Sequence, residues 1–365
     1  MATVMPRHAR RCSRDEITKS PFSSYEALNE YKKNYANRFI RQLITGTVTA
    51  PTAVTKTTCI CVPPGSCPNQ SNDGSGQLDI RIVTNPSDIN TPVPNTCSYA
   101  LARCCLNSPY QCGVRYPPPP GSAPSGPGQA AFGAYPWQAA ILTLGEIYLG
   151  SGALVSSKYV LTVAHKVNNV PIASIKVRLG EWNASGITEP IPAQDFQITR
   201  LYIHPEFNSN NLYNDVALIR LASEVQLGPV PTIASICLSP NSFSGQKCYV
   251  AGWGKDDFNG LYQAIQKEVD VTVISTDTCQ EKLRKTRLGP NFVLNGTTFV
   301  CAGGENGKDA CTGDGGSPLV CSSNGRWYAV GLVAWGIGCA VKDVPGVYVN
   351  LSTYIPWIES IIAQS

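Results

Sequence analysis

Six cysteines fall within residues 59–105 and limit what this part of the chain can fold into. A segment of this length cannot bury a large hydrophobic core, so disulfide bonds must supply much of its stability. The spacing alone leaves all fifteen pairings of six cysteines open. The whole chain contains fifteen cysteines, which indicates an oxidising, extracellular compartment. The sequence therefore predicts a small disulfide-stapled domain built on Cys59, Cys61, Cys67, Cys97, Cys104 and Cys105.

The residues on either side of this segment differ from it in composition. Residues 1–58 carry ten Lys or Arg against four Asp or Glu, although the whole chain has a net charge of only +4. We interpret them as a basic N-terminal extension that is either a solvated tail or a contact for an acidic partner. Its start, MATVMPRHARRCSRDE, has no apolar stretch of the signal-peptide kind, so we expect a mature or engineered form of a secreted protein. Residues 106–131 contain YPPPPGSAPSGPG and are expected to form a proline-rich linker.

Residues 132–365 have the pattern of an all-β domain. Short runs rich in Val, Ile and Tyr are separated by Gly, Pro and Asn, which is typical of a barrel or a sandwich. Repeated isoleucines over residues 355–362, with Pro356 near their start, predict one closing helix. A charged content of 15% argues against a nucleic-acid-binding protein, and no apolar run is long enough to predict a membrane span.

Several motifs of this region resemble the chymotrypsin-type serine proteases and follow in that family's order. They are YPWQAAI, LTVAHK, NDVALIRL, YVAGWG, CTGDGGSPLVC, VAWG and PGVYVNL. The resemblance implies a mostly β fold of two packed six-stranded barrels with a C-terminal helix and a cleft between the barrels. The cysteine spacing of residues 59–105 is similar to that of the arthropod clip domain, which implies the pairs Cys59–Cys104, Cys61–Cys97 and Cys67–Cys105.

The acyl-transfer chemistry of such proteases needs a hydroxyl nucleophile, an imidazole base and a carboxylate that orients the imidazole. By resemblance, His165 matches the base and Asp215 the carboxylate, but Gly315 stands at the position of the nucleophile. Without a side-chain hydroxyl, most of the rate enhancement is expected to be lost. The resemblance also implies an oxyanion donor at Gly313, an acid at the floor of the specificity pocket at Asp309, and pocket walls at Gly336 and Gly346.

Ser317 is the alternative nucleophile. Two residues along an extended chain displace the Cα atom by about 6–7 Å, farther than the hydrogen bond between a serine and its base allows. We therefore expect Ser317 not to replace the missing group.

The activation machinery departs from the family in a second way. The family pairs a newly cut N-terminal amine with the acid before the nucleophile, here Asp314. No Lys or Arg lies between Arg115 and Lys158, so no cut can place an amine correctly, and the loop must be held by other contacts.

The cysteines of the barrel region depart from the family at one bridge. Family pairing implies Cys248–Cys321, Cys279–Cys301 and Cys311–Cys339, and Cys112 with Cys237 would tie the clip side to the barrel. The bridge of the histidine loop is missing, because Gly150 and Lys166 stand at its positions. Cys12 is then left over, free or available for an intermolecular link.

Two further kinds of site are expected on the surface. Glu181, Glu189 and Asp195 lie where many family members bind Ca²⁺ with oxygen ligands, and the alternative is a solvated acidic loop. Sequons for N-glycosylation occur at Asn69, Asn183, Asn295 and Asn350.

Taken together, the chain resembles the clip-domain serine protease homologues of arthropod haemolymph. The resemblance implies a non-catalytic secreted cofactor of prophenoloxidase activation in melanisation. It would be cut by an upstream clip-domain protease, bind phenoloxidase and self-assemble. The candidate cut follows Arg81, with Arg38 and Arg41 as alternatives. Three other functions stay open: a pattern-recognition or adhesion protein, a protease that uses Ser317, and a decoy that holds basic peptides at Asp309.

Overall fold

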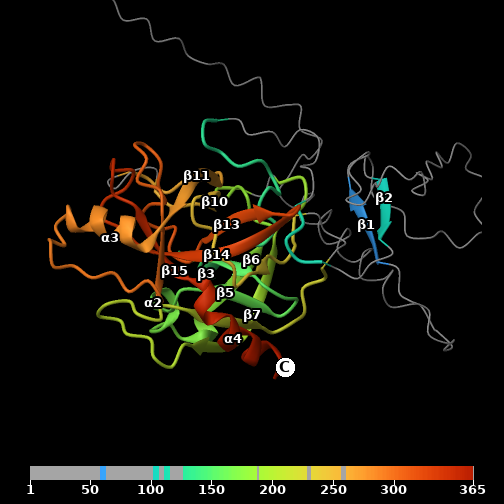
Figure 1. Cartoon of the computed structure of the whole chain (residues 1–365). Helices are drawn as coiled ribbons and strands as arrows, with labels where there is room; N and C mark the ends of the chain where they lie inside the picture. Colours follow the sequence, from blue (N-terminus) through green and yellow to red (C-terminus); the bar gives the residue numbers. More distant parts are fainter. Residues whose placement is uncertain are drawn as a thin grey trace, which may run out of the picture. The chain divides into compact units, whose positions relative to one another are not determined.

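The computed structural model describes residues 58–62, 102–106, 111–115, 126–186, 189–227, 232–255 and 260–364 (Figure 1). Most of the basic extension, of the clip segment and of the proline-rich linker lies outside this range. The same holds for Cys12, Asn69 and the candidate cut sites at Arg38, Arg41 and Arg81.

The clip segment contributes one pair of antiparallel strands, β1 (Thr58–Val62) and β2 (Ala102–Leu106). Their register places Cys59 opposite Cys105 and Ile60 opposite Cys104. The pairing joins the two ends of the cysteine-rich segment in sequence. The three expected clip disulfides depend on side chains that lie outside the described residues.

The first barrel consists of six antiparallel strands that close in the order β3-β4-β5-β8-β7-β6. Its inside is filled by branched aliphatic side chains such as Val160, Val177 and Ile219, which suit a pleated, half-buried surface. A short helix, α2 (Ala164–Val167), follows β5, and a 3-10 turn, η1 (Ile172–Ser174), precedes β6. The strands are β3 (Gln138–Thr143), β4 (Tyr148–Leu154), β5 (Tyr159–Thr162), β6 (Ile175–Leu179), β7 (Gln194–Ile203) and β8 (Ala217–Leu221).

The second barrel also closes through six antiparallel strands, in the order β13-β10-β11-β12-β15-β14, with β13 paired back to β14. A seventh strand, β9 (Cys237–Leu238), pairs with β14 in parallel. The two six-stranded barrels confirm the predicted fold. The strands are β10 (Lys247–Gly252), β11 (Lys267–Ile274), β12 (Phe299–Ala302), β13 (Pro318–Ser323), β14 (Arg326–Trp335) and β15 (Gly346–Asn350).

Two longer helices complete this domain. The sequence predicted α4 (Leu351–Ile362), which buries Leu351, Tyr354 and Ile358. It did not predict α3 (Thr276–Arg284), which is preceded by the N-cap Ser275, whose hydroxyl accepts a hydrogen bond from the amide of Thr278. This is a common helix N-cap.

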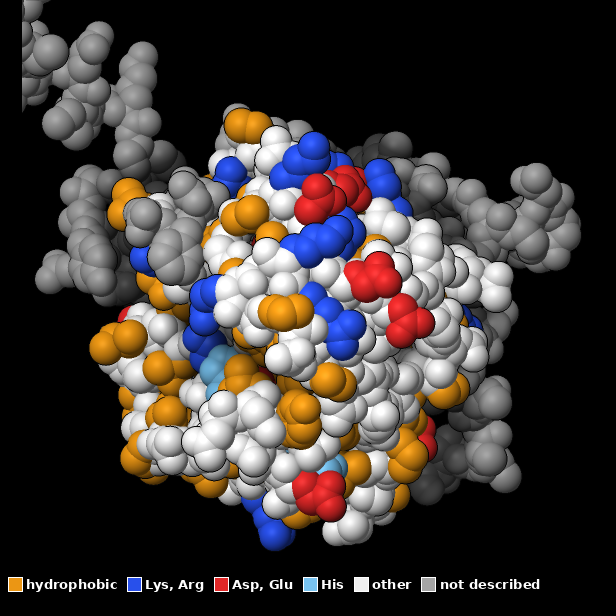
Figure 2. Space-filling view, turned by 60° about the vertical axis from the view of Figure 1, so that its left-hand side comes forward, with side chains coloured by type: hydrophobic (Ala, Val, Ile, Leu, Met, Phe, Trp, Pro, Cys, Tyr) orange, Lys and Arg blue, Asp and Glu red, His pale blue; other side chains and the backbone are white. Residues whose placement is uncertain are grey.

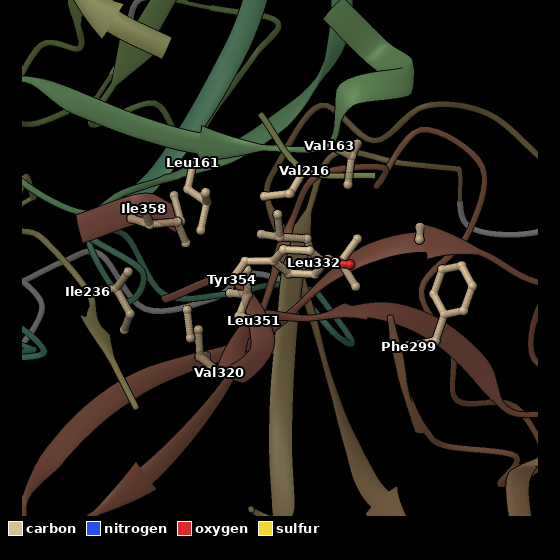
Figure 3. Packing of buried hydrophobic residues seen from close by; sticks show 14 of the residues in the cluster. Leu161, Val163, Val216, Ile236, Phe299, Val320, Leu332, Leu351, Tyr354 and Ile358 are labelled. Atoms are coloured by element: carbon tan, nitrogen blue, oxygen red, sulfur yellow. The ribbon is translucent and has the colours of Figure 1, made fainter. Parts of the chain in front are cut away.

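A hydrophobic cluster joins the two barrels and the closing helix (Figure 3). Leu161, Val163 and Val216 of the first barrel lie in the same cluster as Leu332 of the second barrel and Tyr354 of α4. Val163 and Val216 directly precede α2 and β8. The packing therefore brings the two segments that carry His165 and Asp215 to the junction of the barrels.

Four disulfides lie in the described part of the chain: Cys112–Cys237, Cys248–Cys321, Cys279–Cys301 and Cys311–Cys339. All four were expected from the resemblance. The barrel domain also begins somewhat before residue 132. The amide of Ala130 donates to the carbonyl of Gln266, and Ala130 is fully buried.

The surface carries both signs of charge. On the face drawn in Figure 2, basic and acidic side chains are interspersed. Among the residues that the structure describes, no helix is long and apolar enough to span a bilayer.

Candidate functional site

His165 and Asp215 form a hydrogen-bonded pair at the junction of the barrels. His165 Nδ1 lies 2.6 Å from Asp215 Oδ2, and the backbone amide of His165 donates to Asp215 Oδ1 over 2.8 Å. The Asp215 side chain is fully buried, whereas the His165 side chain is 25% exposed. The carboxylate therefore holds the ring by Nδ1 and leaves Nε2 to face the cleft, as a general base requires.

Residue 315 lies where Nε2 points but offers no proton to transfer. A Cβ atom built on Gly315 would be 3.5 Å from His165 Nε2, which shows that the two residues meet as the sequence predicted. The same Cβ atom would be only 2.6 Å from Cε of Lys166 and 3.6 Å from its Nζ. The stem of Lys166 thus occupies the space into which a side chain at position 315 would extend.

Lys166 reaches this space because Gly150 and Lys166 replace the two cysteines that form the disulfide of the histidine loop in the family. A Cβ atom on Gly150 would lie 3.2 Å from Cγ of Lys166 and 2.8 Å from the carbonyl oxygen of Gly315. The lysine therefore runs past Gly150 toward Gly315. Burial lowers the pKa of Lys166, and Asp215 and Asp314 oppose this shift by favouring the charged form.

Ser317 does not face His165 as a spare nucleophile but belongs to a buried polar network. Its side chain is fully buried, and its hydroxyl accepts a hydrogen bond of 3.2 Å from Nε2 of Gln138. The same amide group of Gln138 also donates to Ser151 Oγ and to the carbonyl of Ala251. Ser317 therefore ties the strand β13 to the first barrel.

Asp314 is held by backbone amides. Its Oδ1 accepts from the amide of Gly254 over 2.9 Å, and its Oδ2 accepts from the amide of Cys311 over 3.0 Å. Burial raises the pKa of this carboxyl group, and the two amide donors and Lys166 counteract the shift. The sequence predicted that the loop of Asp314 is held by contacts other than an activation amine. The two hydrogen bonds from backbone amides are such contacts.

An aromatic ring covers the expected oxyanion position. Gly313 has φ +105°, and a Cβ atom on it would lie 2.5 Å from Cε1 of Tyr262. Tyr262 is 57% exposed and packs edge-on against Tyr148. Only glycine can keep both this backbone conformation and this contact.

Asp309 lies at the base of the expected specificity pocket. Its Oδ2 accepts from the amide of Ala340 over 3.2 Å, whereas Oδ1 is buried without a hydrogen-bond partner among the described residues. Burial raises the pKa of Asp309 to about 7, and the charge of Asp314 adds to this effect. A Cβ atom on Gly346 would lie 3.0 Å from Oδ1, which confirms that Gly346 adjoins the acid, while Gly336 lies on an exposed segment after β14.

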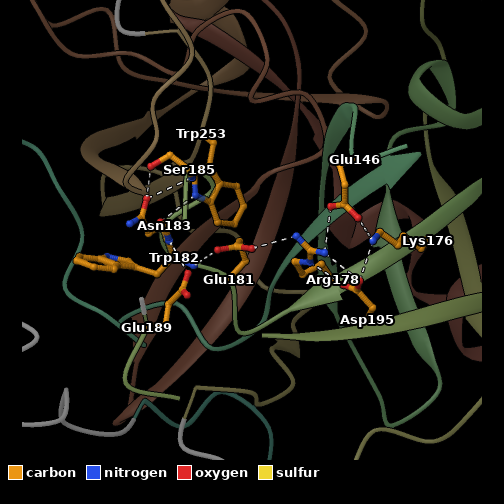
Figure 4. Close-up of polar contacts among 10 residues, drawn as sticks. All are labelled: Glu146, Lys176, Arg178, Glu181, Trp182, Asn183, Ser185, Glu189, Asp195 and Trp253. Carbon is orange, nitrogen blue, oxygen red and sulfur yellow. Dashed lines mark hydrogen bonds and ion pairs between the residues drawn. The ribbon is translucent and has the colours of Figure 1, made fainter. Parts of the chain in front are cut away.

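The three carboxylates of the predicted calcium loop are not brought to one point (Figure 4). Glu189 lies close to Glu181, and burial together with the Glu189 carboxylate raises the pKa of Glu181 to about 7. Asp195 instead forms ion pairs of 2.6 Å with Arg178 and 2.7 Å with Lys176. Within the described ranges, no group of three or more His, Cys, Asp or Glu is arranged to hold a metal ion. Calcium binding in this loop stays a prediction that rests on Glu181 and Glu189.

The sequons differ in how their asparagines are engaged. Asn350 donates through Nδ2, the atom that would carry a glycan, to the carbonyl of Gly296 over 3.2 Å. Asn183 and Asn295 accept hydrogen bonds through Oδ1 from residues that follow them in sequence. Glycosylation at these positions stays a prediction.

Comparison with known proteins assigns the chain to a family. A model of the trypsin family matches residues 126–358. The chain belongs to the trypsin family of serine proteases. A second model, described as the serine protease clip domain of PPAF-2, matches residues 50–106. The protein is thus a clip-domain serine protease homologue.

Relatives of this homologue include proteins named as inactive. It is 52% identical over 320 residues to an inactive CLIP domain-containing serine protease A3 of Aedes aegypti, covering 85% of this chain and 68% of that protein. It is 33% identical over 332 residues to the inactive A8 protein of Anopheles gambiae, covering 83% and 88%. It is 39% identical over 298 residues to phenoloxidase-activating factor 2 of Galleria mellonella, covering 76% and 95%.

Sequence reasoning missed two residues of this site. It noted Lys166 only as the position of a lost cysteine, although a long basic side chain directly after His165 signals a change in the cleft. For Tyr262 the sequence offered no signal, because the residue comes from a surface loop that belongs to none of the family motifs.

Proposed function

We propose that this clip-domain serine protease homologue is a secreted, non-catalytic cofactor of phenoloxidase activation. One observation carries the non-catalytic part. Residue 315, at which His165 Nε2 is directed, is a glycine, and the stem of Lys166 fills the space beside it. Nothing at this point can form an acyl-enzyme, because acyl transfer by such a pair needs a hydroxyl or thiol within hydrogen-bond distance of the imidazole.

The preserved scaffold supports a binding role. The pair of His165 and Asp215, the four disulfides and the two closed barrels are intact although the nucleophile is missing. The disulfides are typical of proteins in oxidising compartments, which supports secretion. The name of the relative from Galleria mellonella, phenoloxidase-activating factor 2, supports phenoloxidase as the partner.

The direct test is reconstitution with purified prophenoloxidase and an upstream clip-domain protease. We expect phenoloxidase activity to rise when the proteolysed full chain is added, and to rise less with the uncut chain. The variant Arg81→Gln should abolish the effect if cleavage after Arg81 activates the protein, and Arg41→Gln tests one of the alternative cut sites in the same assay. Equal phenoloxidase activity with and without the chain would refute the cofactor proposal.

A fluorophosphonate probe tests the loss of catalysis separately. We expect no covalent label on the cut chain under conditions that label trypsin fully. A label on Ser317 would show that the protein is an active protease.

A further inference from the structure

Lys166 brings an amine into the former active centre. Its side chain is half-buried and packs along Gly150 and Gly315, in the space that a nucleophile at residue 315 would need. Among the residues that the structure describes, its Nζ atom forms neither a hydrogen bond nor an ion pair. An ammonium group that is partly withdrawn from water carries a desolvation cost, and here no bond to a partner offsets this cost. Lys166 is therefore not held as one member of a structural ion pair.

The surroundings of Lys166 favour its neutral amine form. Burial lowers the pKa of the group, and the charges of Asp215 and Asp314 oppose this shift. Asp215 already accepts two hydrogen bonds from His165, and Asp314 accepts two from backbone amides. The neutral amine is the nucleophilic form of lysine, and partly desolvated lysines are the ones with which proteins form Schiff bases.

The imidazole of His165 lies close to this amine. Nε2 of His165 is 3.5 Å from the position that a Cβ atom would take on Gly315, and Nζ of Lys166 is 3.6 Å from the same position. The two nitrogens thus flank one small space at the junction of the barrels. Asp215 holds the ring by Nδ1, which leaves Nε2 able to accept or to donate a proton. A nucleophile and a proton carrier therefore meet at this point.

An aldehyde is the class of electrophile that suits these two groups. Its carbonyl carbon is unhindered, and its reaction with an amine needs only a proton carrier and releases only water. A peptide amide is far less electrophilic, and attack by an amine would merely exchange one amide for another. Amine nucleophiles of proteins accordingly react with carbonyl compounds through Schiff bases.

We propose that Lys166 is the nucleophile of a covalent capture site in the former active centre, where it forms a reversible imine with aldehydes. The nitrogen lone pair attacks the carbonyl carbon, and one amine proton passes to the carbonyl oxygen to give a carbinolamine. The C–O bond then breaks as the C=N bond forms, and His165 carries the second amine proton to the oxygen, which leaves as water. The step consumes no oxidant or reductant and leads to no turnover.

This inference goes beyond the proposed function, because it requires no phenoloxidase and no activating cut. It also agrees with the loss of proteolysis, since the captured group stays on the protein until water releases it. The site would be occupied by a small carbonyl compound and not by a peptide.

Reductive trapping tests the proposal on the full chain. The protein is treated at pH 7 with acetaldehyde and sodium cyanoborohydride, and peptide mass spectrometry follows alkylation at each lysine. Lys285, the exposed C-cap residue of α3, is the reference within the same sample. We expect Lys166 to be alkylated at least about threefold faster than Lys285, because only the neutral amine attacks and its fraction depends on the pKa. The ratio should fall as the pH is raised to about 10, where an ordinary lysine also becomes largely neutral.

Two variants and one control assign the roles. Lys166→Arg keeps the positive charge but removes the amine, so alkylation at this position should disappear while that of Lys285 is unchanged. His165→Gln should slow alkylation of Lys166 alone. His204→Gln is the matched control, because His204 follows β7 and packs against Tyr354 and Trp357. Thermal melting of each variant confirms that it folds.

Alkylation of Lys166 at or below the rate of Lys285 at pH 7 would overturn the proposal. A ratio that stays constant with pH would overturn it as well, because access and not the neutral amine would then set the rate. An unchanged rate in His165→Gln would overturn the part assigned to His165. None of these results affects the reconstitution with prophenoloxidase, so the inference and the proposed function can fail independently.

Discussion

The Cε atom of Lys166 lies 2.6 Å from the position that a Cβ atom would take on Gly315. This distance is shorter than a normal carbon–carbon contact of about 3.5–4.0 Å, so the lysine stem and a side chain at residue 315 exclude each other as the structure stands. The lysine stem therefore occupies the space that the nucleophile's side chain would need. A side chain at residue 315 would first have to move the flexible end of Lys166.

We predict that Gly315→Ser does not restore proteolysis. The new hydroxyl would have to displace Lys166 before it could reach His165 Nε2, and Asp314 would still lack an activation amine. Hydrolysis of a chromogenic arginine substrate and labelling by a fluorophosphonate probe should both stay at the background of the native chain. The double variant Gly315→Ser with Lys166→Ala removes the steric block, and labelling of the single variant at residue 315 would contradict this account.

Ser317→Ala should lower the free energy of unfolding by about 1 kcal/mol, because it removes the acceptor of the Gln138 hydrogen bond in a buried network. Urea denaturation measures the change. Ser322→Ala, at an exposed position of β13, the strand that follows Ser317, is the control and should change the stability by less than about 0.5 kcal/mol. An equal, small effect of both substitutions would show that the network contributes little.

Asp309 should make the stability of the protein depend on pH. Burial raises its pKa to about 7 in the folded state, well above the ordinary value of an aspartate, so between these two values the folded state keeps a proton that the unfolded state has already lost. The stabilising contribution of this group is therefore full below about pH 4 and is lost as the pH rises through about 7. Asp309→Asn should flatten this part of the stability curve, as chemical denaturation at several pH values will show. The pKa of Glu181 is also raised to about 7, so this residue contributes to the same part of the stability curve. The separate variant Glu181→Gln measures its share.

Arg115 should resist trypsin-like proteases although it is the last basic residue before the barrel. Its guanidinium lies 4.5 Å from the ring centre of Tyr135 and 4.5 Å from that of Trp327, and it donates to the carbonyl of Ala134. Cleavage would require these contacts to open. Limited proteolysis followed by N-terminal sequencing should find no cut after Arg115 in the native chain, and Trp327→Ala should accelerate cleavage there. An early cut after Arg115 in the native chain would contradict this prediction.

Local motifs made much of this protein predictable. The family motifs occur in order along the chain and contain His165, Asp215 and Gly315. Because the same motifs form or adjoin strands of the two barrels, folding of the barrels brings the three residues together. The four barrel disulfides were expected from the resemblance for the same reason. The helix α3 was missed because its signal is a single capping serine at Ser275 in a polar stretch.

The amino-acid sequence determined that residue 315 has no hydroxyl, that no activation cut can follow a basic residue between Arg115 and Lys158, and that the chain folds as two barrels. Only the tertiary structure decided which contacts Lys166, Ser317 and Asp314 make. Lys166 extends over Gly315 because Gly150 and Gly315 leave room for it. Ser317 is buried because it lies directly before β13 and bonds to Gln138 of the first barrel. Asp314 turns to backbone amides because a buried carboxylate must find donors. These outcomes depend on contacts between segments that are far apart in the chain. Local sequence patterns do not reveal such contacts.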